Sequence, residues 1–398
     1  MVRRVAGLDV HKDSIFVCVK KGSYQSEVKE FDTSTSGLTE LHHFLHGEQV
    51  EKVAMESTGI YWMPVWRALE QDFELTLVNP YFIKQMPGRK TDVKDAQWIA
   101  TLLDKGMLRS SVVPEKRIRV LRMYLRRYAH LQGQLNRCFQ ELEQYLSRCN
   151  IKIASLSSTI GSKTVLKVVE GIIKGETSPG QLIEHVHGRI INRKGREKVL
   201  RALDGIIEAQ DIFILKQIFQ DYQHISLQSQ ELLAQAEQIA DTHYNEQINR
   251  LQTIPGVSKL SAVIIFAEIG GDVSLFKTAH HLSGWCGLRP KNEESAGKIK
   301  NTRIGKGNKY LRRILVQSAW AASRTKGCYL KDKFERLSIR KVRKKALIAI
   351  ARKQLVIVWH ILYNNEDYVE PVIVLTEKQL DQKRKYYKQK LEQLEKAG

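Results

Sequence analysis

The chain has 398 residues, 42% of them apolar, and a net charge of +21. This length suits two or three domains with buried cores. Because we find no run of about 18 apolar residues and no signal-peptide pattern at the start, we expect neither a membrane span nor secretion. The five cysteines are scattered without zinc-ligand spacing, which argues against a disulfide framework or a zinc finger and predicts a reducing cytoplasm.

The charge is distributed unevenly along the chain. Residues 1–113 hold 14 Lys and Arg against 15 Asp and Glu, whereas residues 114–398 hold 50 against 28. Within the second part, residues 289–360 hold 21 basic and 4 acidic side chains, a net charge of +17. Such a surface repels itself unless it meets a polyanion. An anionic membrane would also serve, but basic residues interleaved with apolar ones at helical spacing favour nucleic acid.

The first hundred residues predict alternating strands and helices. Three short strands joined by turns indicate an antiparallel meander, and a helix, a strand, a helix, a strand and a helix follow. The predicted elements cover, in order, residues 2–10, 14–20, 26–31, 38–45, 50–55, 58–70, 74–78 and 91–104. This order fits a mixed sheet flanked by helices, as in ribonuclease H-like nucleases.

The rest of the chain predicts helices. Residues 114–250 contain a long basic amphipathic helix that includes Arg122 and Leu135, and a second seam with three/four spacing from Ile225 to His243. Glycines and prolines punctuate shorter helices between them. The pattern fits an ordinary bundle or a coiled-coil arm for oligomerisation. Residues 251–365 predict a third unit, apolar and then basic, and residues 366–398 a charged tail.

Four carboxylates follow the predicted elements of the first part. Asp9 ends the first strand, Glu56 ends the fourth strand, and Asp92 and Asp95 share one face of the next helix at i, i+3 spacing. Converging carboxylates repel each other unless a dication joins them, and Mg²⁺, or Mn²⁺ in its place, prefers oxygen ligands. Two such ions about 3.5–4 Å apart clamp a phosphodiester. Taken singly, each acid also has an ordinary interpretation. Glu56 would be a surface acid at a strand end, and Asp92 would interact with the helix dipole in the first turn of a helix whose N-cap is Thr91.

Two features of the C-terminal part predict contacts with phosphate. The turn Pro255-Gly256 opens a helix in the manner of a helix-hairpin-helix, and N–H groups exposed there can hold a phosphate, although such turns also simply cap helices. Small residues around Ser295 allow a close backbone approach, while by composition alone that serine is one polar loop residue among many. Basic side chains that can surround a phosphate are Lys298, Arg303, Lys306, Arg312 and Arg313.

Three segments carry a family resemblance. Residues 7–12 (Gly-Leu-Asp-Val-His-Lys), 56–61 (Glu-Ser-Thr-Gly-Ile-Tyr) and 91–96 (Thr-Asp-Val-Lys-Asp-Ala) resemble the transposases of the insertion sequence 110 family, and the middle region is more similar to its 1111 subgroup. The likeness covers nearly the whole chain.

The resemblance implies a RuvC-like, ribonuclease H-like catalytic domain over residues 1–113, a helical or coiled-coil region over 114–250 and a transposase domain over 251–365. It implies that Asp9, Glu56, Asp92 and Asp95 form the metal site. It also implies that Ser295, in a Ser-x-Gly segment, is a nucleophile that forms a covalent phosphoserine, and that an element-encoded RNA pairs with donor and target DNA.

We therefore predict a Mg²⁺-dependent DNA transposase or site-specific recombinase of the bacterial or archaeal cytoplasm, acting at the nucleoid. Because about 200 residues separate the carboxylates from Ser295, a site assembled between protomers of a dimer or tetramer is expected. One alternative is a metal-dependent, structure-selective nuclease in which the serine is dispensable. Another is a non-catalytic nucleic-acid-binding protein, against which four intact carboxylates count.

Overall fold

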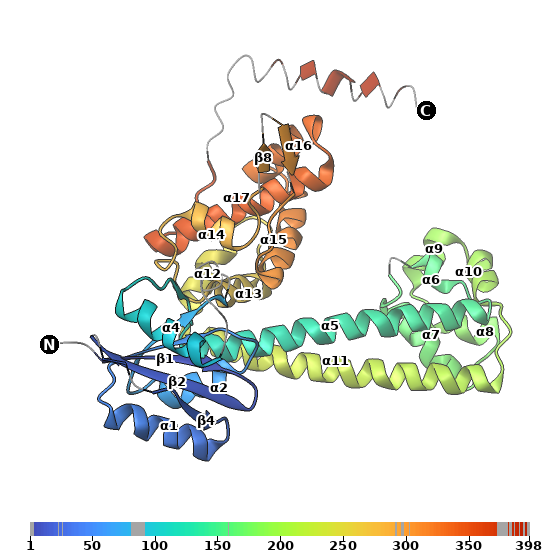
Figure 1. The fold of residues 1–398 in the computed structure, drawn as a ribbon. Helices are drawn as coiled ribbons and strands as arrows, with labels where there is room; N and C mark the ends of the chain where they lie inside the picture. The colour runs from blue at the N-terminus through green and yellow to red at the C-terminus, as the bar shows by residue number, and fades with distance from the viewer. Residues whose placement is uncertain are drawn as a thin grey trace. The chain divides into compact units, whose positions relative to one another are not determined.

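The computed structural model describes residues 4–22, 24–25, 27–80, 92–157, 159–290, 293–295, 298–301 and 303–371, with single residues of the tail between 381 and 395. The chain forms two compact units, Met1–Pro114 and Glu115–Gly398 (Figure 1). Each has its own core, and each is described separately.

The first unit contains the predicted mixed sheet. Strand β1 pairs antiparallel with β2 and parallel with β5, which pairs parallel with β6. Two short strands, β3 on β2 and β7 on β6, extend the sheet beyond the sequence prediction. The strands are β1 (Arg4–Val10), β2 (Ser14–Lys21), β3 (Tyr24–Gln25), β4 (Lys29–Asp32), β5 (Lys52–Glu56), β6 (Glu74–Val78) and β7 (Ser110–Ser111).

Helices cover both faces of this sheet. Helices α1 (Thr35–Gly47) and α2 (Trp62–Leu69) pack on the face that presents the even-numbered residues of β1, and α4 (Asp92–Asp104) packs on the opposite face. Side chains alternate along a strand, so each face has its own apolar set. Helix α2 begins later than predicted, because residues 58–61 form a turn in which Gly59 has a φ of +54°.

Gly7 allows α4 to approach β1 closely. A Cβ atom at this position would lie 2.2 Å from the backbone N of Ala100 and 2.4 Å from the carbonyl oxygen of Ala96. The other end of α4 lies near the start of β1, since Asp104 pairs with Lys20 at 4.0 Å and Lys20 is opposite Val5. Helix α4 therefore runs antiparallel to β1, and its first residues lie toward the carboxyl end of that strand.

The second unit begins with a long helix pair, as the sequence predicts. Helices α5 (Lys116–Arg148) and α11 (Ala209–His243) lie side by side in Figure 1. A small helical insert, which separates them in the sequence, lies at one end of the pair. Midway along the pair, the Gln132 amide donates a hydrogen bond of 2.8 Å to the buried Ser229 hydroxyl. The insert comprises α6 (Ile153–Leu156), α7 (Lys163–Ile173), α8 (Pro179–Leu182), η1 (Ile183–His185), α9 (Gly188–Lys194) and α10 (Arg196–Leu203).

The opposite end of the helix pair contributes to a C-terminal helical core. Its buried residues Ile118, Leu121 and Ala240 belong to the same apolar cluster as the helices that follow. These are α12 (Asn245–Gln252), α13 (Lys259–Ile269), α14 (Ala279–Trp285), α15 (Lys309–Ala322), α16 (Tyr329–Arg340) and α17 (Arg343–Asn364), with one hairpin of β8 (Glu293–Ser295) and β9 (Lys298–Asn301). The sequence did not predict this hairpin.

Helix α17 is the one helix of the described residues that is long and apolar enough to cross a membrane by length and composition alone. Its inner face is packed in the C-terminal core, where Ile350, Leu355 and Val358 are fully buried. The Trp359 indole N–H also donates a hydrogen bond of 3.1 Å to the Phe276 carbonyl. These contacts account for the apolar composition of α17 within a helical core.

We expect Gly7→Ala to destabilise the first unit by at least about 2 kcal/mol, because the added methyl group meets helix backbone that cannot move aside. Gly47→Ala is the matched control, since nothing lies within 4 Å of a Cβ there, and its effect should stay within about 0.5 kcal/mol. Urea unfolding followed by circular dichroism measures both. Equal stabilities of the two variants would contradict the close packing of α4 on β1.

Candidate functional site

Asp9 and Glu56 lie at the ends of adjacent parallel strands. The last aligned pair of β1 and β5 is Leu8 with Met55, so the two carboxylates are one residue further along each strand. By the alternation of side chains, both belong to the sheet face that α4 covers. The prediction that these acids lie at the ends of the two strands is confirmed, since Asp9 is the penultimate residue of β1 and Glu56 is the last residue of β5.

Each of these carboxylates has a local polar contact. Asp9 is only 6% exposed, and its Oδ2 lies 3.1 Å from Nε2 of His11. The Thr58 hydroxyl donates a hydrogen bond of 3.1 Å to Oε1 of Glu56. A buried carboxylate needs such partners to offset its lost hydration. His11 was not predicted as a site residue, although a histidine two residues after a strand-end acid is a usable signal in the sequence.

The start of α4 contributes the other two predicted acids. Since α4 runs antiparallel to β1, its first turn, with Asp92 and Asp95, lies toward the edge at which Asp9 and Glu56 are found. The Asp95 side chain is half-buried, whereas the Asp92 side chain and Thr91 lie outside the described residues. Among the side chains that the structure describes, no three His, Cys, Asp or Glu residues are grouped to hold a metal ion.

Ser295 lies in the β8–β9 hairpin of the second unit. It is the last residue of β8 and pairs with Lys298, the first residue of β9. The side chains of both residues lie outside the described part of the chain. Ser283, a serine of the preceding helix α14, is fully buried and donates to the Ala279 carbonyl at 2.9 Å.

The base of this hairpin is held by close backbone contacts. Pro290 and Ile304 form an isolated β-bridge just outside the hairpin. A Cβ on Gly307 would lie 2.4 Å from the backbone of Cys286, so glycine is required where these two segments of the chain meet. The Arg312 guanidinium donates to the Gly305 carbonyl at 3.1 Å. These contacts hold together residues 286–290 and 304–307, which form the neck from which the hairpin extends.

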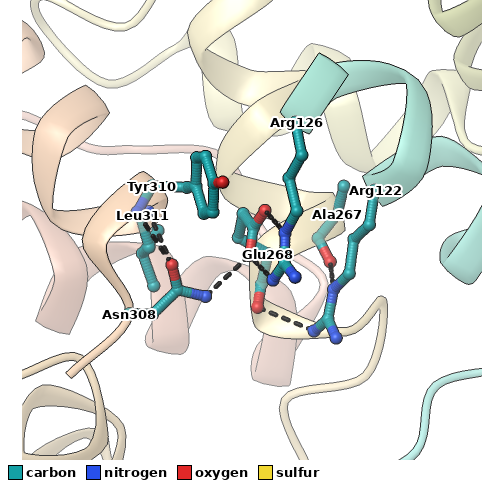
Figure 2. A network of polar contacts seen from close by, with 7 residues as sticks. All are labelled: Arg122, Arg126, Ala267, Glu268, Asn308, Tyr310 and Leu311. Carbon is teal, nitrogen blue, oxygen red and sulfur yellow. Dashed lines mark hydrogen bonds and ion pairs between the residues drawn. The ribbon is translucent and has the colours of Figure 1, made fainter. Parts of the chain in front are cut away.

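A buried carboxylate fixes the helix that follows the neck. Glu268 on α13 is 1% exposed and accepts two hydrogen bonds from Arg126 on α5, at 2.9 and 2.8 Å. It also accepts one of 2.6 Å from the amide of Asn308, whose Oδ1 caps α15 by accepting from the N–H groups of Tyr310 and Leu311. Figure 2 shows this network, which the sequence analysis missed.

Two arginines of α5 therefore hold the end of α13. Arg122 donates to the carbonyl oxygens of Ala267 and Glu268 at 2.6 and 2.8 Å (Figure 2). Burial lowers the pKa of the Arg122 guanidinium to about 10, so it stays charged at neutral pH. The hydrogen bonds to Glu268 raise the pKa of Arg126. Both arginines are therefore charged at neutral pH.

The remaining predicted phosphate contacts have different surroundings. Arg303, Lys306 and Arg313 are exposed, and Arg312 is half-buried. The Pro255-Gly256 turn packs against the helical core, because a Cβ on Gly256 would lie 2.3 Å from the Ser318 carbonyl oxygen, and Gln354 donates to the Pro255 carbonyl at 3.0 Å. This packing gives the turn a structural role, and its contact with DNA stays a prediction.

Comparison with protein families gives two matches. A model described as the transposase IS116/IS110/IS902 family matches residues 248–335, and a transposase model of the DEDD type from IS110 elements matches residues 6–151. The first match contains Ser295 and Glu268, and the second contains all four predicted carboxylates. The resemblance expected from the three sequence segments is confirmed.

Individual proteins extend this comparison. The transposase for insertion sequence element IS1111A of Coxiella burnetii is 33% identical over 132 residues, 31% of this chain and 35% of that protein. The chain thus matches about a third of that relative's length. The pilin gene-inverting protein of Moraxella bovis is 24% identical over 387 residues, 92% of this chain and 98% of that protein. Among solved structures, T. thermophilus RuvC in complex with a Holliday junction substrate covers 27% of this chain and 99% of that one at 16% identity, with a TM-score of 0.22.

We expect Glu268→Ala to destabilise the second unit by about 2–4 kcal/mol, because Arg126 and Asn308 lose a buried acceptor; Arg126 is partly exposed, which limits the cost. The control is Glu197→Ala, which removes an exposed i, i+4 partner of Arg201 and should leave the urea midpoint nearly unchanged. If both variants unfold at the wild-type midpoint, the buried network does not stabilise the unit.

Proposed function

Because the chain belongs to the IS116/IS110/IS902 family of transposases, we propose that it cuts and rejoins DNA with the carboxylates of the first unit and the Ser295 hydroxyl. The observation that carries this proposal is the placement of Asp9 and Glu56 on one face and at one edge of the sheet, with the first turn of α4 directed to the same edge. That edge gathers acidic groups, which do not bind a DNA phosphate by themselves.

The chemistry of these side chains fits a divalent cation. Asp9, Glu56, Asp92 and Asp95 offer only carboxylate oxygens, the ligands preferred by Mg²⁺ and accepted by Mn²⁺. When bound, the ion supplies positive charge to the scissile phosphate and makes a nearby hydroxyl more acidic. Nε2 of His11 lies 3.1 Å from Oδ2 of Asp9 and so helps to hold that carboxylate in place at the end of β1.

The proposed covalent step uses Ser295. Its Oγ attacks the phosphorus of one DNA strand, an O–P bond to the serine forms, and the bond from phosphorus to the leaving sugar oxygen breaks. The serine proton passes to solvent, and the sugar oxygen gains a proton as it leaves. Rejoining reverses these changes with the hydroxyl of another strand. The bond energy is retained in the phosphoserine, so no ATP is consumed.

Partners follow from charge and similarity. The net charge of +17 over residues 289–360 suits donor and target DNA and an element-encoded guide RNA, both held through their backbones. The similarity to a pilin gene-inverting protein along 92% of the chain favours rejoining over cutting alone. A dimer or tetramer in the cytoplasm, at the nucleoid, belongs to the same proposal.

Asp9→Asn and Glu56→Gln should each lower DNA cleavage by more than about 100-fold, because each replaces a charged ligand by a neutral amide of the same shape. DNA affinity should change by less than about two-fold. The matched control is Asp13→Asn, an exposed acid in the β1–β2 turn, which should cut as the wild type does. Cleavage that persists in Asp9→Asn, or with a chelator present, would sink the metal site.

Ser295→Ala should stop both cutting and joining, because it removes the oxygen of the proposed nucleophile. Wild-type protein should form a denaturant-resistant adduct with labelled DNA, and peptide mapping should place it on Ser295; Ser57→Ala is the control and should keep the adduct. If Ser295→Ala still cuts, the protein is a metal-dependent nuclease that uses water. Attachment at Ser57 or Ser283 would reject the residue while keeping the covalent mechanism.

A further inference from the structure

A pocket of about 480 Å³ lies between the end of α15 and the start of α17, within the second unit. Both helices are labelled in Figure 1. This volume is within the usual range of small-molecule sites, about 300–1,000 Å³. None of the residues considered so far for DNA cleavage lines it. Its lining consists of Trp320, Ser323, Arg324, Arg343, Lys344 and Leu347.

An aromatic ring and a guanidinium group face each other in this pocket. Trp320 is 39% exposed, and the guanidinium carbon of Arg324 lies 4.4 Å from the centre of its ring. Trp320 lies in the last turn of α15, and Arg324 follows the end of that helix. Between them, the Ser323 hydroxyl donates a hydrogen bond of 2.8 Å to the Trp320 carbonyl. Such a pair stacks the planar guanidinium over one face of the indole, so that planar groups and a positive charge lie together.

The surroundings of the pocket are strongly basic. Among its lining residues three are cationic and none is acidic. Arg343 and Lys344 belong to the first turn of α17, which has no side-chain cap and no acidic residue. Cations are unfavourable at the start of a helix, where the dipole is already positive. An anionic group at this position would remove that penalty.

We propose that this pocket binds an unpaired nucleotide of a nucleic acid, which rests on the proposed function. The base stacks on the Trp320–Arg324 surface and contacts Leu347, and its phosphate is held by Arg343 and Lys344. A base within a duplex is already stacked on both faces, so only an unpaired one enters. An acidic peptide matches the charge but has no planar group for the exposed ring.

Full-length protein is titrated with a short labelled single strand, as DNA and as RNA of the same sequence, and with the blunt duplex. Trp320→Ala should weaken single-strand binding by about ten-fold, since stacking on an aromatic side chain contributes about 1–3 kcal/mol per base. Duplex binding should change by less than about two-fold. Whichever of DNA or RNA loses affinity identifies the source of the nucleotide.

Matched variants distinguish binding in the pocket from a general effect of positive charge and from a loss of folding. Arg324→Gln should weaken single-strand binding more than Lys326→Gln, which removes the same charge two residues away from an exposed position outside the lining. Trp320→Phe, which keeps a ring, should retain part of the affinity. Trp285→Ala removes another exposed tryptophan, 43% exposed and packed on Phe276, and should have little effect.

A second readout locates the base directly. A single strand with 5-iodouracil should cross-link to Trp320 on irradiation, as peptide mapping shows. Equal losses for single strand and duplex in Trp320→Ala, or no loss in either, overturn the proposal. So does displacement of the bound strand from this pocket by polyglutamate but not by an unlabelled strand. A wild-type protein that binds no nucleic acid would instead refute the proposed function.

Discussion

The C-terminal half depends on one buried carboxylate. Glu268 is 1% exposed, so its charge is stable there only because Arg126 and Asn308 complete its hydrogen bonds. These partners come from helices separated by long stretches of chain, and Asn308 in turn caps α15. Glu268 thus positions the first turns of α5 and the start of α15, the basic helix that follows the hairpin. A buried ion pair contributes little net stability compared with apolar packing, but it tolerates few alternative arrangements, and this favours a unique geometry.

The four predicted carboxylates and Ser295 lie at the ends of strands or helices that close backbone contacts hold in place. In the first unit, Gly7 lets the backbone of α4 contact β1, which fixes where the helix begins relative to Asp9. In the second, the Pro290–Ile304 bridge and the contact of Gly307 with Cys286 define the neck of the hairpin that contains Ser295. Groups that act on a phosphate need positions held to fractions of an ångström, and rigid elements supply this better than loops do. The glycines in both places serve close approach.

The sequence was sufficient where apolar residues form a continuous run or a helical seam. The apolar runs that lead to Asp9 and to Glu56 and the seam of α11 each reflect residues buried in their own unit, and the structure contains all three. The hairpin of Ser295 escaped prediction because its strands have only three and four residues, with Ile299 as their single apolar residue. Glu268 was visible as a lone acid in an apolar run, yet its partner Arg126 is 142 residues away, a distance that no local pattern spans. The late start of α2 depends on the positive φ of Gly59, which spacing alone does not reveal.

The length of α5 gives the Glu268 network a mechanical consequence. This helix has 33 residues, so it is about 50 Å long at 1.5 Å per residue. Its side chains Arg122 and Arg126, near its first turns, hold the end of α13. The network is therefore the fulcrum of a lever. A tilt of about 5° at that fulcrum displaces the far end, about 35 Å away, by about 3 Å, roughly the spacing of neighbouring base pairs. Small adjustments beside the hairpin are thereby amplified at the helical insert, while α11, packed along α5, keeps the lever from bending.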